Sequence, residues 1–136
     1  MYQSYTQLRV RYAETDQMKY VYYGNYAIYF EVARVECLRN LGLDYKSLEN
    51  EHKIMMPVLE HYSRYLKPAL YDDLLTIRVN IPELPQSRIR FEYEILRENT
   101  LLHNGYTTLA FIHTETLRPV RCPEVLLNLL KPYFEV

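Results

Sequence analysis

The sequence has no tryptophan, only three glycines and two cysteines, and no apolar run near the roughly 20 residues that cross a bilayer. The scattered glycines, Gly24, Gly42 and Gly105, cannot build a glycine-rich phosphate loop. Cys37 and Cys122 form neither a metal-like pair nor a disulfide framework. The opening MYQSYTQLRV has no basic segment followed by an apolar one, so we expect no signal peptide, no stable membrane insertion and a cytoplasmic location.

Net charge is also small. The formal value of −1 removes the main electrostatic signature of a nucleic-acid binder. Four histidines form no HExxH motif and no close pair, so we expect no metal site, and no cofactor is indicated. With 136 residues, 49% of them hydrophobic and 24% charged, the chain is typical of one globular domain spanning residues 1–136.

What the chain does have is tyrosine, 15 residues of it, and clear alternation of apolar and polar side chains. Residues 5–13 alternate, with Leu8, Val10 and Tyr12 on the face predicted to be buried. Further strands are predicted over 58–66, 74–81, 87–96 and 101–113. Because short turns join most of these segments, their pairing is expected to be antiparallel.

The period changes over residues 25–41, where an apolar stripe predicts one long helix. Asn25 is the expected cap of its first turn, and Gly42 occupies the left-handed position after its last turn. A short helix over 44–51 is capped by Asp44, and Pro123 fits the first turn of a closing helix. These elements predict an α+β fold, in which one curved antiparallel sheet of about five strands buries one long central helix. The edges of such a sheet favour dimerisation.

The segment AETDQMKYVYYGNY raises the question of chemistry. A helix start offers unpaired N–H groups, here from the Tyr23–Gly24–Asn25 region, and Gly24 would let a ligand approach the backbone. Asp16 lies just ahead of these donors and is a candidate nucleophile or general base. The alternative is a structural role for Asp16 in an Asx-turn before the helix.

The stretch RVRYAETDQMKYVYYGNYAIYFEVARVECLRNLGL resembles the opening of the 4-hydroxybenzoyl-CoA thioesterase family, in its broad acyl-CoA thioesterase branch. The shared pattern is R-x-x-Y-x-E-T-D-x-M, a tyrosine-rich segment, N-Y, F-E-x-A-R and a following L-G. The resemblance continues through PVLEHYSRYLKPALYDDLLTI, RIRFEYEI and ETLRPVRCPEVL, and so covers nearly the whole chain. It implies a hotdog fold and an acyl-CoA thioesterase that pairs with itself as a homodimer or homotetramer.

By this resemblance, Asp16 matches the catalytic carboxylate and the backbone N–H of Tyr23 matches the oxyanion donor. Two departures stand out, because many members carry histidine at the position of Tyr23 and glycine is common at that of Lys19. A non-catalytic module that binds acyl-CoA or acyl-carrier protein is therefore the alternative function.

Coenzyme A carries phosphates, which basic side chains bind well. The expected clamps are Ser87, Arg88 and Arg90, with Arg64 and Lys67 as second choices, although alternating arginines are also typical of a solvated strand face.

Three other residues are given structural roles. Glu14 is read as a structural or solvent partner rather than a second acid. Glu31 is expected to pair with Arg34 at i,i+3 on the helix surface. Cys37 lies in the apolar stripe and is expected to be a core thiol rather than a nucleophile.

Overall fold

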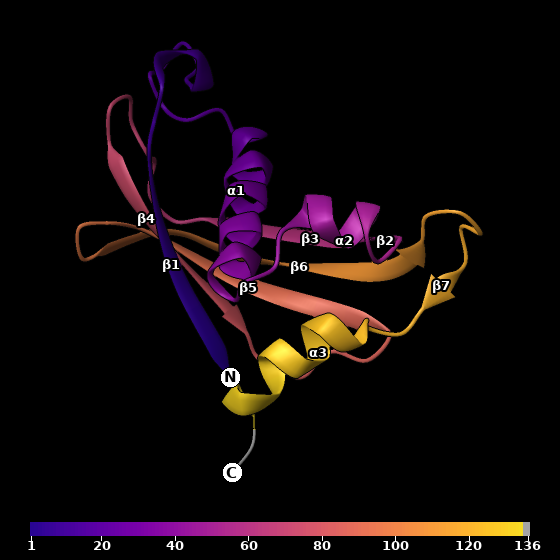
Figure 1. Ribbon diagram of the computed structural model, residues 1–136. Helices are drawn as coiled ribbons and strands as arrows, with labels where there is room; N and C mark the ends of the chain where they lie inside the picture. The colour runs from indigo at the N-terminus through magenta and orange to yellow at the C-terminus, as the bar shows by residue number, and fades with distance from the viewer. Residues whose placement is uncertain (135–136) are drawn as a thin grey trace.

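The computed structural model describes residues 1–134 of the chain, and its centre is one antiparallel sheet (Figure 1). Its strands are β1 (Tyr2–Arg9), β2 (Ile54–Met55), β3 (Val58–Tyr65), β4 (Leu74–Ile81), β5 (Arg88–Arg97), β6 (Thr100–His113) and β7 (Pro119–Val120). The five long strands correspond to the five predicted segments, although the first has different limits. The sheet has seven strands rather than five because two-residue β2 and β7 also pair with β6.

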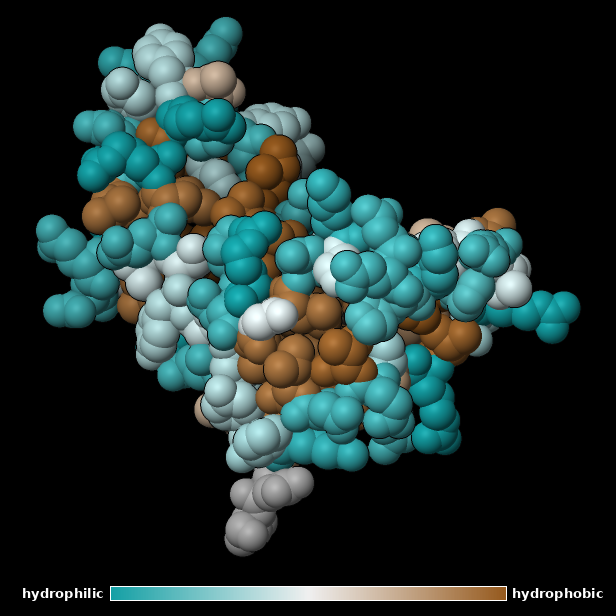
Figure 2. Space-filling model, in the orientation of Figure 1, coloured by the Kyte–Doolittle hydropathy of each residue, from teal (hydrophilic) through white to brown (hydrophobic). Residues whose placement is uncertain are grey.

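The helices are α1 (Asn25–Asn40), α2 (Tyr45–Asn50) and α3 (Glu124–Leu130), with short 3₁₀ helices η1 (Tyr12–Glu14) and η2 (Lys131–Tyr133). Figure 1 shows α1 lying across one face of the curved sheet, with α2 beside it and α3 near the two chain ends. Apolar side chains gather between the lower end of α1 and α3 in the same view (Figure 2). This arrangement is the expected α+β fold with one long central helix.

In the sheet, β3 does not lie beside β4, the strand that follows it in the sequence. The hydrogen-bonded order is β3–β6–β5–β4–β1, so β3 and β1 are the two edges of the sheet. In the register of β6 with β3 and β5, His103 lies opposite Tyr65, and Ala110 lies opposite Arg88. Seven residues of β6 therefore separate these two levels, which is about 23 Å along the strand.

The core lies between α1 and the sheet face that the alternation predicts to be buried. That face contributes Leu75, Ile77, Val79 and Ile81 from β4 and Ile89, Phe91, Tyr93 and Ile95 from β5. Phe30 of α1 stacks on Tyr93 with ring centroids 4.1 Å apart. A Cβ at Gly105 of β6 would lie 3.0 Å from the Phe30 ring and 2.1 Å from the Tyr62 backbone oxygen. Only glycine fits there, which lets α1 approach the sheet closely.

The predicted helix ends are confirmed in part. The Asp44 carboxylate accepts a hydrogen bond from Ser47 N at 2.6 Å and caps α2, and Gly42 adopts the left-handed conformation with φ +98°. Pro123 is the N-cap residue of α3. The cap prediction for Asn25 is wrong, because Gly24 holds that position and the Asn25 amide donates instead to the backbone oxygen of Glu14.

The first strand begins and ends earlier than predicted. It covers Tyr2–Arg9, with Tyr2 and Ser4 buried, whereas Tyr12 lies in η1 and is exposed. Val10 is buried as predicted, but its N–H bonds to the backbone oxygen of Asp73 after the strand has ended. Pairing with β4, rather than the apolar set at Leu8, Val10 and Tyr12, thus sets the limits of β1.

Across residues 1–134 no helix is long and apolar enough to cross a membrane. The same residues hold no cluster of three or more histidine, cysteine or acidic side chains that could bind a metal ion.

Candidate active site

Asp16 lies in a tight loop between η1 and α1. One carboxylate oxygen, Oδ1, accepts hydrogen bonds from the backbone N–H of Met18 at 2.8 Å and of Tyr20 at 3.3 Å. The backbone of Asp16 also bonds to Tyr20, with N–O 2.8 Å. The other oxygen, Oδ2, has no hydrogen-bond partner within residues 1–134. The Asx-turn is therefore real, but it uses one oxygen and leaves the other free for chemistry.

Lys19, where the resemblance leads us to expect glycine, has a backbone conformation that suits glycine. Its φ is +66°, in the left-handed region that costs a residue with a side chain roughly 1–2 kcal/mol. The backbone N–H of Lys19 donates to the backbone oxygen of Asp16 at 2.9 Å and so closes the turn. The lysine therefore holds this turn at the cost of local strain.

Glu14 joins this loop to α1 and has the structural role expected of it. Its carboxylate accepts hydrogen bonds from Arg11 N at 2.9 Å, from Arg11 Nε at 3.0 Å and from the Tyr29 hydroxyl at 2.9 Å. Burial alone would raise the pKa of Glu14, but these donors and the Arg11 charge outweigh it, so the pKa is lowered. Burial raises the pKa of the Tyr29 hydroxyl, and its hydrogen bond to the Glu14 carboxylate raises it further. Glu14 is thus charged and fully engaged at neutral pH.

The start of α1 leaves two amide donors unused. Tyr22 N–H bonds to the Glu14 backbone oxygen and Asn25 N–H bonds to the Tyr22 oxygen, both at 2.9 Å. Within residues 1–134, the N–H groups of Tyr23 and Gly24 have no acceptor, which leaves the donors expected at a helix start free. A Cβ at Gly24 would lie 3.0 Å from the Tyr22 ring, so this ring, rather than open space for a ligand, adjoins the glycine.

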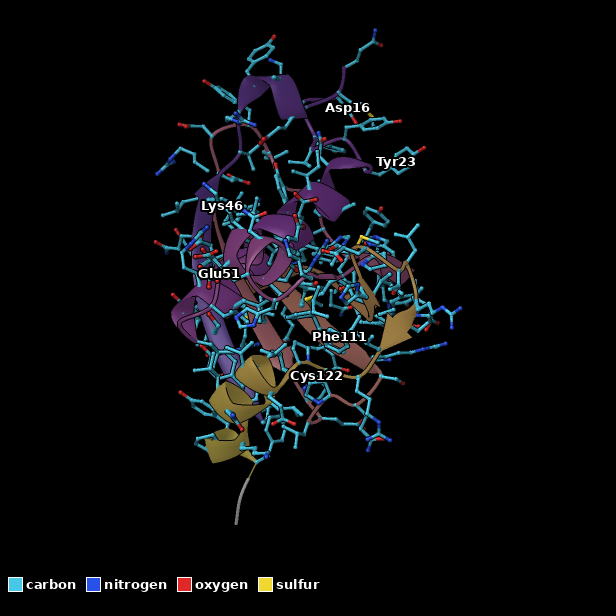
Figure 3. All side chains as sticks on the ribbon, turned by 45° about the vertical axis from the view of Figure 1, so that its right-hand side comes forward. Asp16, Tyr23, Lys46, Glu51, Phe111 and Cys122 are labelled. Carbon is cyan, nitrogen blue, oxygen red and sulfur yellow. The ribbon has the colours of Figure 1, made fainter. Side chains whose placement is uncertain are left out.

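Asp16 and Tyr23 line one cleft of about 320 Å³. Figure 3 shows the two residues at the same end of α1, far from Phe111 and Cys122. The walls are mostly aromatic and apolar: Tyr20, Val21, Tyr26, Tyr65, Leu66 and Pro68, together with Lys67. A carboxylate, a helix start and an apolar cavity therefore meet, as nucleophilic attack on an acyl group requires.

The back of the cleft is held by β3 and β6. The Tyr65 hydroxyl donates to the Tyr23 backbone oxygen at 3.2 Å, and the Tyr26 ring stacks on His103 with centroids 4.0 Å apart. His103 is fully buried, with its Nε2 3.0 Å from Ser63 Oγ. Burial, followed by the charge of His61, lowers the pKa of His103 to about 4, so this imidazole is neutral at pH 7. His103 supports the wall and carries no charge there.

The residues predicted to bind substrate do not all lie together. Lys67 lines the cleft with Asp16. Ser87, Arg88 and Arg90 instead line a separate surface groove of about 390 Å³. The strand register places this groove about 23 Å along β6 from the Tyr65 end of the cleft.

Among the residues of this second groove, Arg90 already contacts other side chains of the chain. Its guanidinium lies 3.8 Å from the centroid of the Tyr106 ring and 3.1 Å from the Glu92 carboxylate. Arg64 is exposed on β3, opposite Asn104.

Sequence reasoning missed Tyr65, because the faces of residues 58–66 are ambiguous in the sequence. The pairing of Tyr65 with His103 fixes its orientation, and pairing partners are not visible in one chain. It also misplaced Arg34, which was expected to pair with Glu31 on the helix surface. Arg34 is buried, with 7% of its surface exposed, and makes no such ion pair.

Comparison with known proteins gives a consistent picture. The thioesterase-like superfamily matches residues 10–130. The acyl-CoA thioesterase YbgC of Haemophilus influenzae is 30% identical over 117 residues, which cover 86% of each chain. The structure of a DHNA-CoA thioesterase from Staphylococcus aureus superposes with a TM-score of 0.86 at 29% identity, covering 100% of this chain and 97% of the other.

A 4-hydroxybenzoyl CoA thioesterase, solved with 4-hydroxybenzoyl CoA, superposes with a TM-score of 0.87 over 95% of this chain and 99% of the other. At 21% identity this likeness concerns the fold alone. The resemblance seen in the sequence is confirmed, and this chain belongs to the thioesterase-like superfamily as a thioesterase with the hotdog fold.

Proposed function

We propose that the protein hydrolyses an acyl-CoA thioester to a free acid and coenzyme A, with Asp16 as nucleophile or general base. The observation that carries the proposal is the shared cleft, which Asp16 and Tyr23 both line, together with a Tyr23 N–H that has no acceptor in the described part of the chain. A relative with this activity, the YbgC thioesterase, matches the chain over 117 residues.

The reaction needs three contributions from these residues. The Tyr23 N–H, with the positive end of the α1 dipole behind it, stabilises the oxyanion that forms on the thioester carbonyl. The Asp16 carboxylate attacks the carbonyl carbon or removes a proton from the attacking water. The carbon–sulfur bond then breaks and the thiolate takes up a proton. In the general-base route the attacking water supplies the hydroxyl of the acid; in the nucleophilic route water then cleaves the mixed anhydride with Asp16, which releases the acid and restores the carboxylate. Because a thiolate leaves readily, one carboxylate and one or two N–H donors suffice.

The aromatic walls bear on substrate binding. Tyr20, Tyr26 and Tyr65 offer flat apolar surfaces to an acyl chain, and Lys67 adds a positive charge at the same cleft. Burial raises the pKa of the Tyr26 hydroxyl further above its ordinary value, and this wall is neutral at physiological pH.

The separated arginines favour a site shared by two copies of the chain. Within residues 1–134, β3 pairs on one side only, so its other side is free. If two β3 strands pair antiparallel about a two-fold axis, the Val58 end of one copy lies near the Tyr65 end of the other. Arg88 and Arg90 of a second copy then approach the Asp16 cleft from across the interface, where they can bind the phosphates of coenzyme A.

Two measurements test the proposal. A thiol-release screen over acyl-CoAs of different chain length, aromatic ones included, is expected to find at least one substrate that is turned over. Calorimetry with a nonhydrolysable acyl-CoA analogue measures binding alone. The use of Asp16 Oδ1 in a turn favours the alternative, a binding module. Tight binding without thiol release from any acyl-CoA would establish that module and refute the thioesterase.

A further inference from the structure

The cleft that Asp16 lines has an exposed rim and a buried floor. Asp16 is half-buried and Tyr23 is exposed, so the carboxylate and the proposed oxyanion donor lie at the rim. Of the nine residues that line the cleft, only Val21 and Tyr26 are buried, with 5% and 3% of their surfaces exposed. The cleft therefore ends against these two residues.

A bound thioester has to run from this rim toward that floor. In the proposed reaction its carbonyl lies beside Asp16 and the Tyr23 N–H. The coenzyme A part is large and charged, so it stays on the solvent side of the carbonyl. The acyl group, on the other side, enters the apolar interior of the cleft, where its far end meets Val21 and the ring of Tyr26.

Three aromatic rings hold the ring of Tyr26. The imidazole of His103 stacks on it, with ring centroids 4.0 Å apart and 8° between the planes. The rings of Tyr65 and Tyr29 meet it edge-on, at centroid distances of 5.3 and 5.8 Å. His103 and Tyr29 are buried and do not line the cleft. The Tyr26 ring thus separates the cleft from the core behind it.

Each of the three supporting rings is itself fixed by a hydrogen bond. The His103 Nε2 lies 3.0 Å from Ser63 Oγ, and the hydroxyls of Tyr29 and Tyr65 donate hydrogen bonds at 2.9 and 3.2 Å. Close-packed interiors leave few voids into which a ring can move. Because Tyr26 has no room to swing aside, the depth of the cleft is a fixed property of the folded chain.

The cleft is also small. Its volume of about 320 Å³ is near the lower end of the range of roughly 300–1,000 Å³ that small-molecule sites span. A long acyl chain therefore has to displace the Tyr26 ring in order to enter fully.

We propose that Tyr26 is the specificity-determining residue of this site, where its ring limits the length of the acyl chain that the site accepts. The inference rests on the proposed function, because the roles of Asp16 and Tyr23 set the orientation of the thioester. Acyl groups that end before the ring should gain about four-fold in kcat/KM per added methylene, which corresponds to about 0.8 kcal/mol of burial. Longer groups collide with the ring, so their kcat/KM falls.

Substitutions of graded size at Tyr26 test this limit. Tyr26→Leu and Tyr26→Ala open space toward His103 by steps, whereas Tyr26→Phe keeps the ring. Thiol release from straight-chain acyl-CoAs of increasing length gives kcat/KM for each variant. The preferred chain length should be unchanged in Tyr26→Phe, longer in Tyr26→Leu and longest in Tyr26→Ala. The first acyl-CoA that is too long for the wild type should gain at least about ten-fold in Tyr26→Leu.

Tyr20→Ala is the matched control. Tyr20 lines the same cleft with 39% of its surface exposed, so this change removes an equal ring from the rim. It should lower kcat/KM by a similar factor at every chain length and leave the preferred length unchanged. A shift as large as that of Tyr26→Leu would overturn the assignment to Tyr26. Circular dichroism checks folding, and if Tyr26→Ala does not fold, the less costly Tyr26→Leu decides.

Calorimetry with nonhydrolysable acyl-CoA analogues of the same lengths separates this inference from the proposed function. Wild-type affinity should rise with chain length and then fall, and Tyr26→Leu should move that fall to longer chains. Thiol release with the same length preference in Tyr26→Leu and the wild type refutes the role of Tyr26 and leaves the thioesterase standing. Length-dependent binding that Tyr26→Leu shifts, without thiol release from any acyl-CoA, refutes the thioesterase and keeps Tyr26 as the limit of the acyl site.

Discussion

The Tyr65 hydroxyl, at the end of β3, donates a hydrogen bond to the Tyr23 backbone oxygen at 3.2 Å. An edge strand of the sheet thus holds the residues just before α1, among them Tyr23, which lines the Asp16 cleft and whose N–H has no acceptor within residues 1–134. The contact links two elements that are 42 residues apart in the sequence. The hydrogen bond holds Tyr23 through its backbone oxygen, so the Tyr23 N–H, the proposed oxyanion donor, takes no part in it.

Tyr65→Phe should keep the fold and loosen this helix start. Loss of one hydrogen bond is expected to lower the free energy of unfolding by about 1 kcal/mol. If the Tyr23 N–H loses a similar amount of transition-state stabilisation, kcat falls about five-fold. Urea unfolding and thiol release measure the two effects. Tyr62→Phe on the opposite face of β3 is the matched control, and an equal effect in both variants would contradict the prediction.

Glu14→Gln tests the junction between the loop and α1. The folded-state pKa of Glu14 lies below its unfolded value, so its contribution to stability is present above the unfolded pKa and is lost as pH falls through the folded pKa. At pH 7 the variant should unfold at lower urea concentration than the wild type, and the difference should shrink below about pH 4. Glu83→Gln, at an exposed position, should show no difference at either pH. A Glu14→Gln difference that is constant with pH would be contrary evidence.

The buried His103 should give the stability of the protein a second dependence on pH. Its folded pKa of about 4 lies below the unfolded value of about 6.5, so the neutral form favours the folded state. This contribution is complete above pH 6.5 and declines as pH falls toward 4. His103→Phe, which keeps a ring against Tyr26, should show a flatter stability profile over this interval in urea unfolding. An imidazole that titrates near 6.5 by NMR in the folded wild type would refute the burial argument.

Lys19→Gly should relieve the positive φ at the end of the Asp16 loop. The gain is expected to be about 1 kcal/mol at most, since glycine loses more backbone entropy on folding. Gln17→Gly, two residues earlier and without a positive φ, introduces the same entropy loss without relieving strain and should destabilise the protein. Thermal unfolding compares the two; equal destabilisation by both variants would exclude strain at Lys19.

Local pattern predicted much of the fold. Strand 74–81 has its predicted limits, and the Asp44 cap and the left-handed Gly42 are confirmed. These features depend on near neighbours in the chain, so one sequence contains them.

Long-range pairing explains the rest. Tyr2 is buried because β1 pairs with β4, and Arg34 is buried because α1 turns this side chain toward Tyr93 and Tyr45. Likewise, Arg88 resembles a clamp in sequence, but the register of β5 with β6 separates it from Asp16. Distances between distant segments are set by tertiary contacts that spacing along one chain does not encode.

The central claim is that the Asp16 carboxylate performs the cleavage, and Asp16→Asn tests it most directly. The asparagine oxygen can still accept the hydrogen bonds from Met18 and Tyr20, so the loop should keep its shape while the charge is lost. Asp72→Asn, an exposed residue outside the cleft, is the matched control. Thiol release from the best acyl-CoA should fall by at least about 100-fold in Asp16→Asn and stay unchanged in Asp72→Asn. Equal turnover by folded Asp16→Asn and the wild type would contradict the account.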